Sequence, residues 1–123
     1  MTLQRHWIGL GSLYGLMAVA MAALAAHAFP RSLDAAAQQM IRDAIQMQGW
    51  HALALLFTGL WAARGTLAHL AGAAFALGTL LFCGTIYALA LASLHLPLVA
   101  PIGGTLLMFG WALLGLSALR HPA

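Results

Sequence analysis

This sequence of 123 residues contains very few charged residues. It contains no lysine and no glutamate, and its formal charge comes from five arginines and two aspartates. Only 6% of the residues are charged while 63% are hydrophobic, which lies far outside the range of soluble globular domains. The arginines are scattered, so no basic stripe can follow a phosphate backbone, and we expect no nucleic-acid partner.

The residues that most enzymes use are also missing or isolated. The two aspartates lie in one short segment, which argues against acid-base catalysis by carboxylates. The single cysteine, Cys83, can form no intramolecular disulfide and is interpreted as a small packing residue. No nucleophile-base motif and no phosphate-binding glycine loop is found. We therefore predict a protein that is not an enzyme and has no cofactor.

The longest uncharged stretch, residues 65–119, determines the predicted architecture. A bilayer penalises charge in its core, so an uncharged run rich in Leu, Ala and Gly indicates a membrane protein. The run is too long for one crossing and is interrupted by Pro97 and Pro101, which predict a turn between antiparallel helices. The expected helices cover about residues 66–94 and 100–119.

The first part of the chain predicts two further membrane helices, at about residues 7–28 and 50–64. An alternative for the first is a cleaved signal peptide, because Ala26-His27-Ala28 fits a small-x-small cleavage pattern. Small residues at helical spacing favour a packed helix instead. Residues 33–48 alternate polar and apolar faces and predict an amphipathic helix at the membrane interface, with an extension of the following helix as the alternative.

Together these segments predict one all-α domain over residues 1–123, an integral membrane four-helix bundle with an additional amphipathic interfacial helix between the first and second membrane helices. With four crossings, Arg5, Arg64 and Arg120 share one side, whereas Arg31 and Arg42 lie opposite and are offset by the two aspartates. The positive-inside rule then predicts that both termini are cytoplasmic.

Four polar residues are expected to converge in one leaflet of this arrangement, namely His27, Gln48, His51 and Tyr87. Polar groups at membrane depth are costly unless they find partners, so the cluster is a candidate site for a metal, a quinone-like head group or a proton. The alternative is that these side chains only hydrogen-bond to one another and to free carbonyls. No strong third ligand accompanies the two histidines, so no metal site is predicted and His27 and His51 remain weak candidates.

Small residues at three- or four-residue spacing predict faces where helices approach closely. The candidate packing residues are Gly11, Gly15, Gly84, Ala88, Gly103 and Gly104.

Several motifs resemble, in order and spacing, the YgdD/YwdK family of small bacterial inner-membrane proteins. They are Ala26-His27-Ala28, Gln48 followed by His51-Ala52-Leu53-Ala54-Leu55, residues 81–87, and Pro101-Ile102-Gly103-Gly104 followed by Gly110-Trp111. The resemblance covers nearly the whole chain. It implies four membrane helices and supplies no activity, because the family is a domain of unknown function. One departure is Met47, at a position where the family commonly has tyrosine.

The function predicted from these observations is that of a binding or accessory component of the membrane. Its partners would be the lipid bilayer and another membrane protein or a second copy of itself. Two alternatives stay open at this point. One is a small carrier or channel for a solute, an ion or a proton, which the polar cluster supports. The other is a histidine-based cofactor-binding membrane protein.

Overall fold

The computed structural model describes residues 2–29, 31 and 33–120. They form α1 (Thr2–His27), α2 (Ala35–Trp61), the short 3-10 helix η1 (Ala62–Arg64), α3 (Thr66–Ala92) and α4 (Val99–Arg120), and this part of the chain contains no strand. Three helices are long and apolar enough to cross a membrane, at Leu3–His27, Thr66–Ala92 and Val99–Arg120. The predicted all-α membrane architecture is confirmed at this level.

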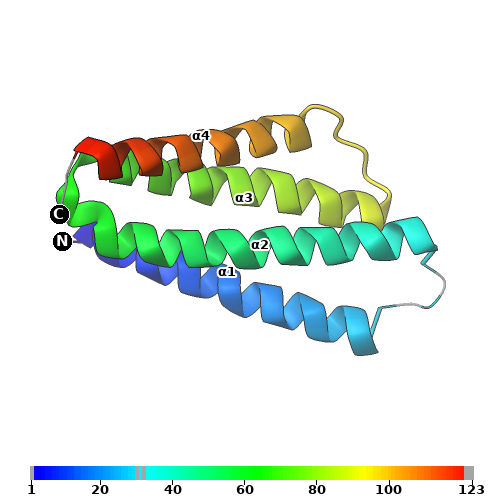
Figure 1. The fold of residues 1–123 in the computed structure, drawn as a ribbon. Coiled ribbons are helices and arrows are strands. Elements are labelled where there is room, and N and C mark those ends of the chain that lie inside the picture. Colours follow the sequence, from blue (N-terminus) through cyan, green and yellow to red (C-terminus); the bar gives the residue numbers. More distant parts are fainter. Residues whose placement is uncertain (1, 30, 32, 121–123) are drawn as a thin grey trace.

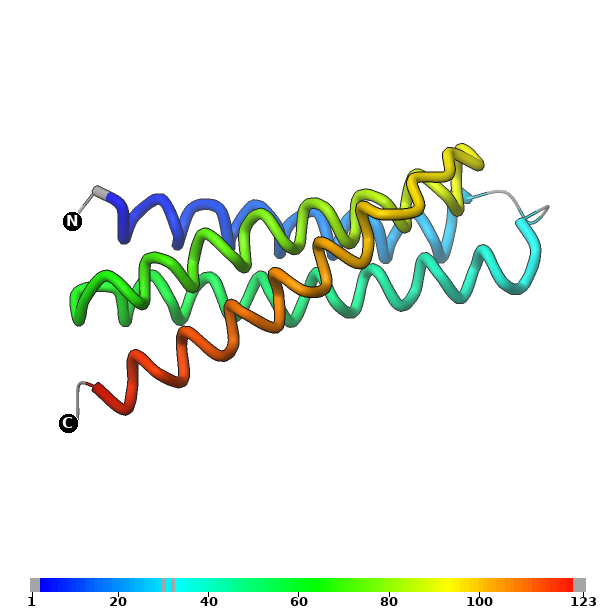
Figure 2. Tube along the Cα trace, turned by 90° about the horizontal axis from the view of Figure 1, so that it is seen from above, coloured from blue at the N-terminus to red at the C-terminus, as the bar shows by residue number. Residues whose placement is uncertain are grey.

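The helices run side by side in alternating directions (Figure 1). α1 packs along α2, α2 along α3 and α3 along α4, whereas α1 touches α3 only briefly. The first residues of α1 and the last residues of α4 lie at the same end, together with η1 (Figures 1 and 2). The α1–α2 and α3–α4 connections lie at the opposite end, where α1 diverges from α2.

The separate interfacial helix predicted at residues 33–48 is not found. That segment is continuous with the helix predicted at 50–64, and the two together form the 27 residues of α2, as in the alternative interpretation. Two features explain the difference. First, no proline interrupts residues 33–61. Second, Gln48, the last residue of the predicted interfacial segment, is buried between helices, where its amide has hydrogen-bond partners.

Local chemistry fixes where the helices begin and end. Asp34 accepts a 2.7 Å hydrogen bond from the backbone N–H of Ala37 and so caps α2. Gly65 separates η1 from α3 with φ 138° and ψ −179°, a conformation that glycine adopts far more readily than other residues. α3 ends at Ala92, and the left-handed backbone of the following Ser93 turns the Leu94 N–H back to the Ala88 carbonyl, at 3.2 Å.

The hydrophobic core lies where α2, α3 and α4 meet. Its buried members are Ala54, Leu55, Ala71, Phe75 and Leu107. The Phe75 ring packs directly on Gly110 of α4, where an added Cβ would come within 2.7 Å of the ring. A membrane supplies no hydrophobic driving force between helices, so such close fitting of large side chains on glycine backbone contributes much of the association.

Two predicted packing glycines occupy very close helix contacts. A Cβ at Gly11 would lie 2.9 Å from the Ala52 carbonyl oxygen of α2. A Cβ at Gly103 would lie 2.5 Å from the Phe82 nitrogen and 3.0 Å from the Gly78 carbonyl oxygen of α3. These glycines therefore allow α1–α2 and α3–α4 to approach backbone to backbone.

The other predicted packing residues have looser surroundings. A Cβ at Gly15 or Gly104 would make ordinary contacts, at 3.8 Å from Ala52 and 3.6 Å from Phe82. Ala88 is half-buried. Gly84 is exposed, and a Cβ there would have no atom of the described chain within 4 Å. Gly84 therefore packs against no helix of the described chain, and its packing role stays a prediction for contact with another molecule.

Candidate functional site

Gln48 joins three helices from the middle of α2. Its side chain is only 5% exposed. The amide nitrogen donates to the backbone carbonyl of Tyr14 on α1 at 2.9 Å, and the amide oxygen accepts from the hydroxyl of Tyr87 on α3 at 2.8 Å. Tyr14 in turn donates its hydroxyl to the Ala76 carbonyl at 2.7 Å. Gln48 and Tyr87 are thus brought together, and their bonds tie α1, α2 and α3.

His51 lies one turn farther along α2 and is 3% exposed. Its Nε2 is 3.0 Å from Nε1 of Trp111 on α4, and its Nδ1 is 2.6 Å from the Met47 carbonyl oxygen. Because the indole N–H is only a donor, Nε2 must accept and Nδ1 must carry the proton that it donates to Met47. His51 is therefore a neutral imidazole with both nitrogens engaged.

Aromatic rings enclose His51 on the side of α3 and α4. Its ring centroid lies 5.9 Å from that of Phe75 and 5.8 Å from that of Trp111, and Phe75 and Trp111 meet edge to face at 5.0 Å. Such packing orients the imidazole and keeps other ligands away from its edges. This arrangement favours a fixed contact between α2 and α4 over an open ligand position.

His27 does not join the other candidates. It is the last residue of α1 and is exposed. The α1 residues that face Ala52, next to His51, are Gly11 and, one turn later, Gly15. His27 is twelve residues farther on, which is about 18 Å along the helix. The expectation that His27 converges with His51 is thus not met, because α2 begins at Ala35 and places His51 near its middle.

The remaining buried polar side chains offer little ligand chemistry. Cys83 donates from its sulfur to the Ala44 carbonyl oxygen at 3.4 Å, across α3 and α2. Thr58 and Thr85 bond back to carbonyls one turn earlier in their own helices. The hydroxyl of Thr79 is buried and has no hydrogen-bond partner among the described residues. Within the same residues, no three His, Cys, Asp or Glu side chains come together as a metal site.

Further polar contacts lie at the end that holds the termini. Trp7 of α1 donates from its indole to Nδ1 of His69 on α3 at 3.0 Å, and Trp61 of α2 donates to the Ser117 hydroxyl on α4 at 2.9 Å. The Arg64 guanidinium lies 4.1 Å above the Trp61 ring. Tryptophan and arginine at the end of a membrane helix are typical of the lipid-water boundary, so this end has the chemistry of an interface.

Sequence reasoning missed several of these partners. Tyr14 contributes a backbone carbonyl and a hydroxyl, and Trp111 supplies the donor to His51, but neither was among the candidate residues. Gly78 was also missed, although it faces Gly103 across α3 and α4. Polar aromatic residues in apolar helices are a usable signal for Tyr14 and Trp111. Which helix they face depends on the relative rotation of the helices, which the sequence does not state.

Comparison with known proteins identifies relatives over nearly the whole chain. Residues 21–104 match the family described as "Protein of unknown function (DUF423)". A "UPF0382 membrane protein" of Haemophilus influenzae is 35% identical, with 98% of this chain and 99% of that protein covered. The "UPF0382 inner membrane protein YgdD" of Escherichia coli is 32% identical over 94% of this chain and 91% of that protein. A Staphylococcus epidermidis UPF0382 membrane protein is 33% identical, with 93% and 95% covered.

No solved structure matches this chain. The relatives confirm the family that the sequence motifs indicate, and their names assign no biochemical activity. Apolar helices of spanning length agree with their description as membrane proteins. This chain is a small membrane protein that belongs to the DUF423, or UPF0382, family of unknown function.

Proposed function

We propose that this protein is a non-catalytic accessory component of the bacterial inner membrane, built as a four-helix bundle with both termini in the cytoplasm. The names of the relatives support the inner-membrane location. Although α2 is more polar than its neighbours, it runs beside them along its length (Figure 1), which supports a fourth crossing. Arg5, Arg64 and Arg120, at the end with the termini, support the cytoplasmic orientation.

The proposal rests on one observation, that the central polar groups already have hydrogen-bond partners within the protein. The Gln48 amide bonds to α1 and α3, and both nitrogens of His51 are engaged by Met47 and Trp111. A carrier or a cofactor site needs polar groups that can exchange partners with a ligand. Here those groups hold helices together, which favours a rigid scaffold.

The outer faces of α1 and α4 are where such a scaffold would meet another membrane protein or a second copy of itself. Each of these helices packs mainly against one neighbour. Val19 of α1 is 70% exposed and Met108 of α4 is 67% exposed. In the bilayer these side chains meet lipid or a protein partner.

Photo-crosslinking in cells tests this proposal. A photoreactive amino acid at Val19 or Met108 should give an adduct of constant mass, containing either one membrane protein or a second copy of this chain. The neighbouring positions Ala18 and Leu107 are buried and serve as matched controls that should give none. A monomer without adducts, recovered from cells and from every mild detergent, would contradict the proposal.

Two further measurements examine the alternatives on the same purified protein. Folded protein in proteoliposomes should produce no flux of ions, protons or common metabolites. Elemental analysis and an absorption spectrum should show no stoichiometric metal and no Soret band. Reproducible flux would favour a carrier, and a stoichiometric cofactor that is lost on replacing His51 would favour a cofactor-binding protein.

A further inference from the structure

A cleft of about 670 Å³ opens between the diverging ends of α1 and α2. The helix ends that line it lie at the end of the molecule opposite the termini (Figure 1). Its walls are the last turns of α1, the connection to α2 and the first turns of α2. Neither Gln48 nor His51 lines it, so it is distinct from the central polar groups. Its volume is in the range of pockets that hold small ligands.

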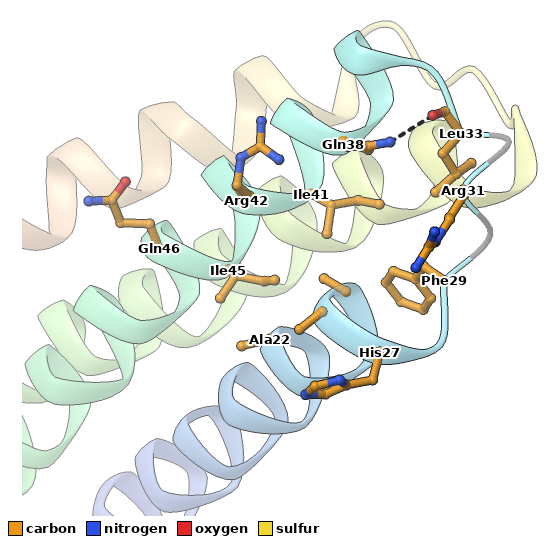
Figure 3. A pocket seen from close by; sticks show the side chains of 12 residues that line it. Ala22, His27, Phe29, Arg31, Leu33, Gln38, Ile41, Arg42, Ile45 and Gln46 are labelled. Atoms are coloured by element: carbon orange, nitrogen blue, oxygen red, sulfur yellow. Dashed lines mark hydrogen bonds between the residues drawn. The ribbon is translucent and has the colours of Figure 1, made fainter.

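The lining is divided into an apolar wall and a polar rim. Ala22 of α1 and Ile41 and Ile45 of α2 point into the space between the two helices (Figure 3). Polar side chains stand around this wall and belong to His27, Arg31, Gln38, Arg42 and Gln46. An amphiphile, with an apolar tail and a polar head, matches this division better than a fully soluble ligand does.

The charge of the rim is positive. Arg31 and Arg42 line the cleft, whereas no carboxylate of the described residues does, and the Arg42 guanidinium also donates to the Gln39 side-chain oxygen at 2.7 Å. The two aspartates of the chain keep their charge but lie outside the lining, where Asp34 accepts from the backbone N–H of Ala37 and Asp43 from the Gln39 amide. The positive charge is therefore local to the lining residues. Guanidinium groups hydrogen-bond phosphate in a fork geometry, and they repel metal cations. The complementary head group is therefore anionic.

The position of the cleft along α1 places it at the level of lipid head groups. The apolar span of α1 ends at His27, which itself lines the cleft. The boundary between hydrocarbon and head groups lies at the end of such a span. The apolar wall then faces the acyl region, and Arg31, which follows this span, lies at phosphate depth. Arg42 starts from the same turns of α2 as Ile41 and Ile45, and its long side chain must extend along the helix to reach that depth.

We propose that this cleft binds one anionic phospholipid, with an acyl chain against Ala22, Ile41 and Ile45 and the phosphate beside Arg31 and Arg42. This inference goes beyond the proposed accessory role and needs no protein partner. It rests on the membrane location and on the cleft alone. A failure of crosslinking at Val19 and Met108 would therefore leave it standing.

Native mass spectrometry with defined lipids tests the proposal. Purified protein is released from detergent in the presence of equal amounts of phosphatidylglycerol and phosphatidylcholine, which differ in head-group charge. One phosphatidylglycerol should be retained in preference to phosphatidylcholine. Equal retention of the two lipids, or retention of neither, would overturn the proposal.

Two pairs of arginine substitutions then locate the bound lipid. The double variant Arg31→Gln/Arg42→Gln should weaken phosphatidylglycerol binding about fivefold per arginine, or on the order of 25-fold in total. The double variant Arg5→Gln/Arg120→Gln removes the same charge from exposed positions at the opposite end and should change binding less than about twofold. An equal loss in both variants would mean non-specific attraction and would contradict the assigned site.

A second pair of substitutions tests the apolar wall. Ala22→Phe fills the cleft from α1 and should lower lipid retention, while Ala23→Phe adds the same volume at an adjacent exposed position that does not line the cleft. Circular dichroism confirms helical content in both. Unchanged lipid retention in a folded Ala22→Phe variant would show that the acyl chain does not bind in the cleft. If Ala22→Phe does not fold, the arginine pairs still decide the proposal, because those side chains are at the surface.

Discussion

The Tyr87 hydroxyl donates a 2.8 Å hydrogen bond to the Gln48 side-chain oxygen, and so links α3 to α2 at the point where Gln48 also holds α1. This bond predicts energetic coupling between the two residues. Tyr87→Phe and Gln48→Leu should each destabilise the protein, and the double variant should lose less than the sum. Interhelical hydrogen bonds in membranes average about 0.6 kcal/mol and reach about 1.7 kcal/mol.

A double-mutant cycle in mixed detergent measures this coupling from unfolding curves. Gln46→Leu is the control, because Gln46 lies on the same helix but is exposed. Its effect should be independent of Tyr87→Phe. Full additivity of Gln48→Leu and Tyr87→Phe would show that the contact does not stabilise the fold.

The two histidines in the predicted cluster should respond very differently to replacement. His51→Ala removes the acceptor of the Trp111 indole and opens space beside Phe75, so a loss on the order of 2 kcal/mol is expected. His27→Ala changes an exposed residue at the end of α1 and should alter stability by less than about 0.5 kcal/mol. Thermal unfolding in one detergent compares them directly, and equal effects would disagree with the structure.

Gly103 should tolerate no side chain, whereas Gly115 on the same helix should. In Gly103→Ala the new Cβ would meet backbone atoms of Phe82 and Gly78, so α4 must move away from α3 at a cost of about 1–3 kcal/mol. Gly115→Ala meets no atom of the described chain within 4 Å and should change stability by less than about 1 kcal/mol. Unfolding titrations of the pair test the close α3–α4 contact, and a neutral Gly103→Ala would rule it out.

Gly65 should be required for a conformational reason and not for close packing. Its φ of 138° lies in a region that residues with a Cβ rarely adopt, so Gly65→Ala should cost about 1–3 kcal/mol. Gly49→Ala is the control, because Gly49 is helical and has open space for a methyl group. Both variants can be compared by thermal unfolding, and equal stability would argue against the strained turn.

The proposed orientation can be checked by cysteine labelling. A cysteine replacing His95, in the exposed α3–α4 connection, should react with an impermeant maleimide in intact spheroplasts. A cysteine replacing Ala63 in η1, at the end with the termini, should react only after the membrane is opened. Cys83 is buried and gives the background of the unmodified protein. The reverse pattern would place the termini outside the cytoplasm.

Much of the fold follows from local sequence features. The uncharged run and its two prolines indicate α3 and α4 to within a few residues, because bilayer exclusion of charge and the geometry of proline act over short distances. α2 is the exception. Its polar first half and Gln48 indicate a boundary near residue 48, yet the helix continues because Tyr14 and Tyr87, distant in sequence, satisfy the buried amide.

The sequence by itself determined that this chain is helical, lies in a membrane and belongs to a family without a known activity. These properties depend on composition and on motifs that can be read in order. Only the tertiary structure decided that Gln48 pairs with Tyr87, that His51 pairs with Trp111, and that His27 stands apart from both. The reason is that such contacts depend on how each helix is rotated and shifted against its neighbours, which is set by close fits such as Gly103 on Phe82.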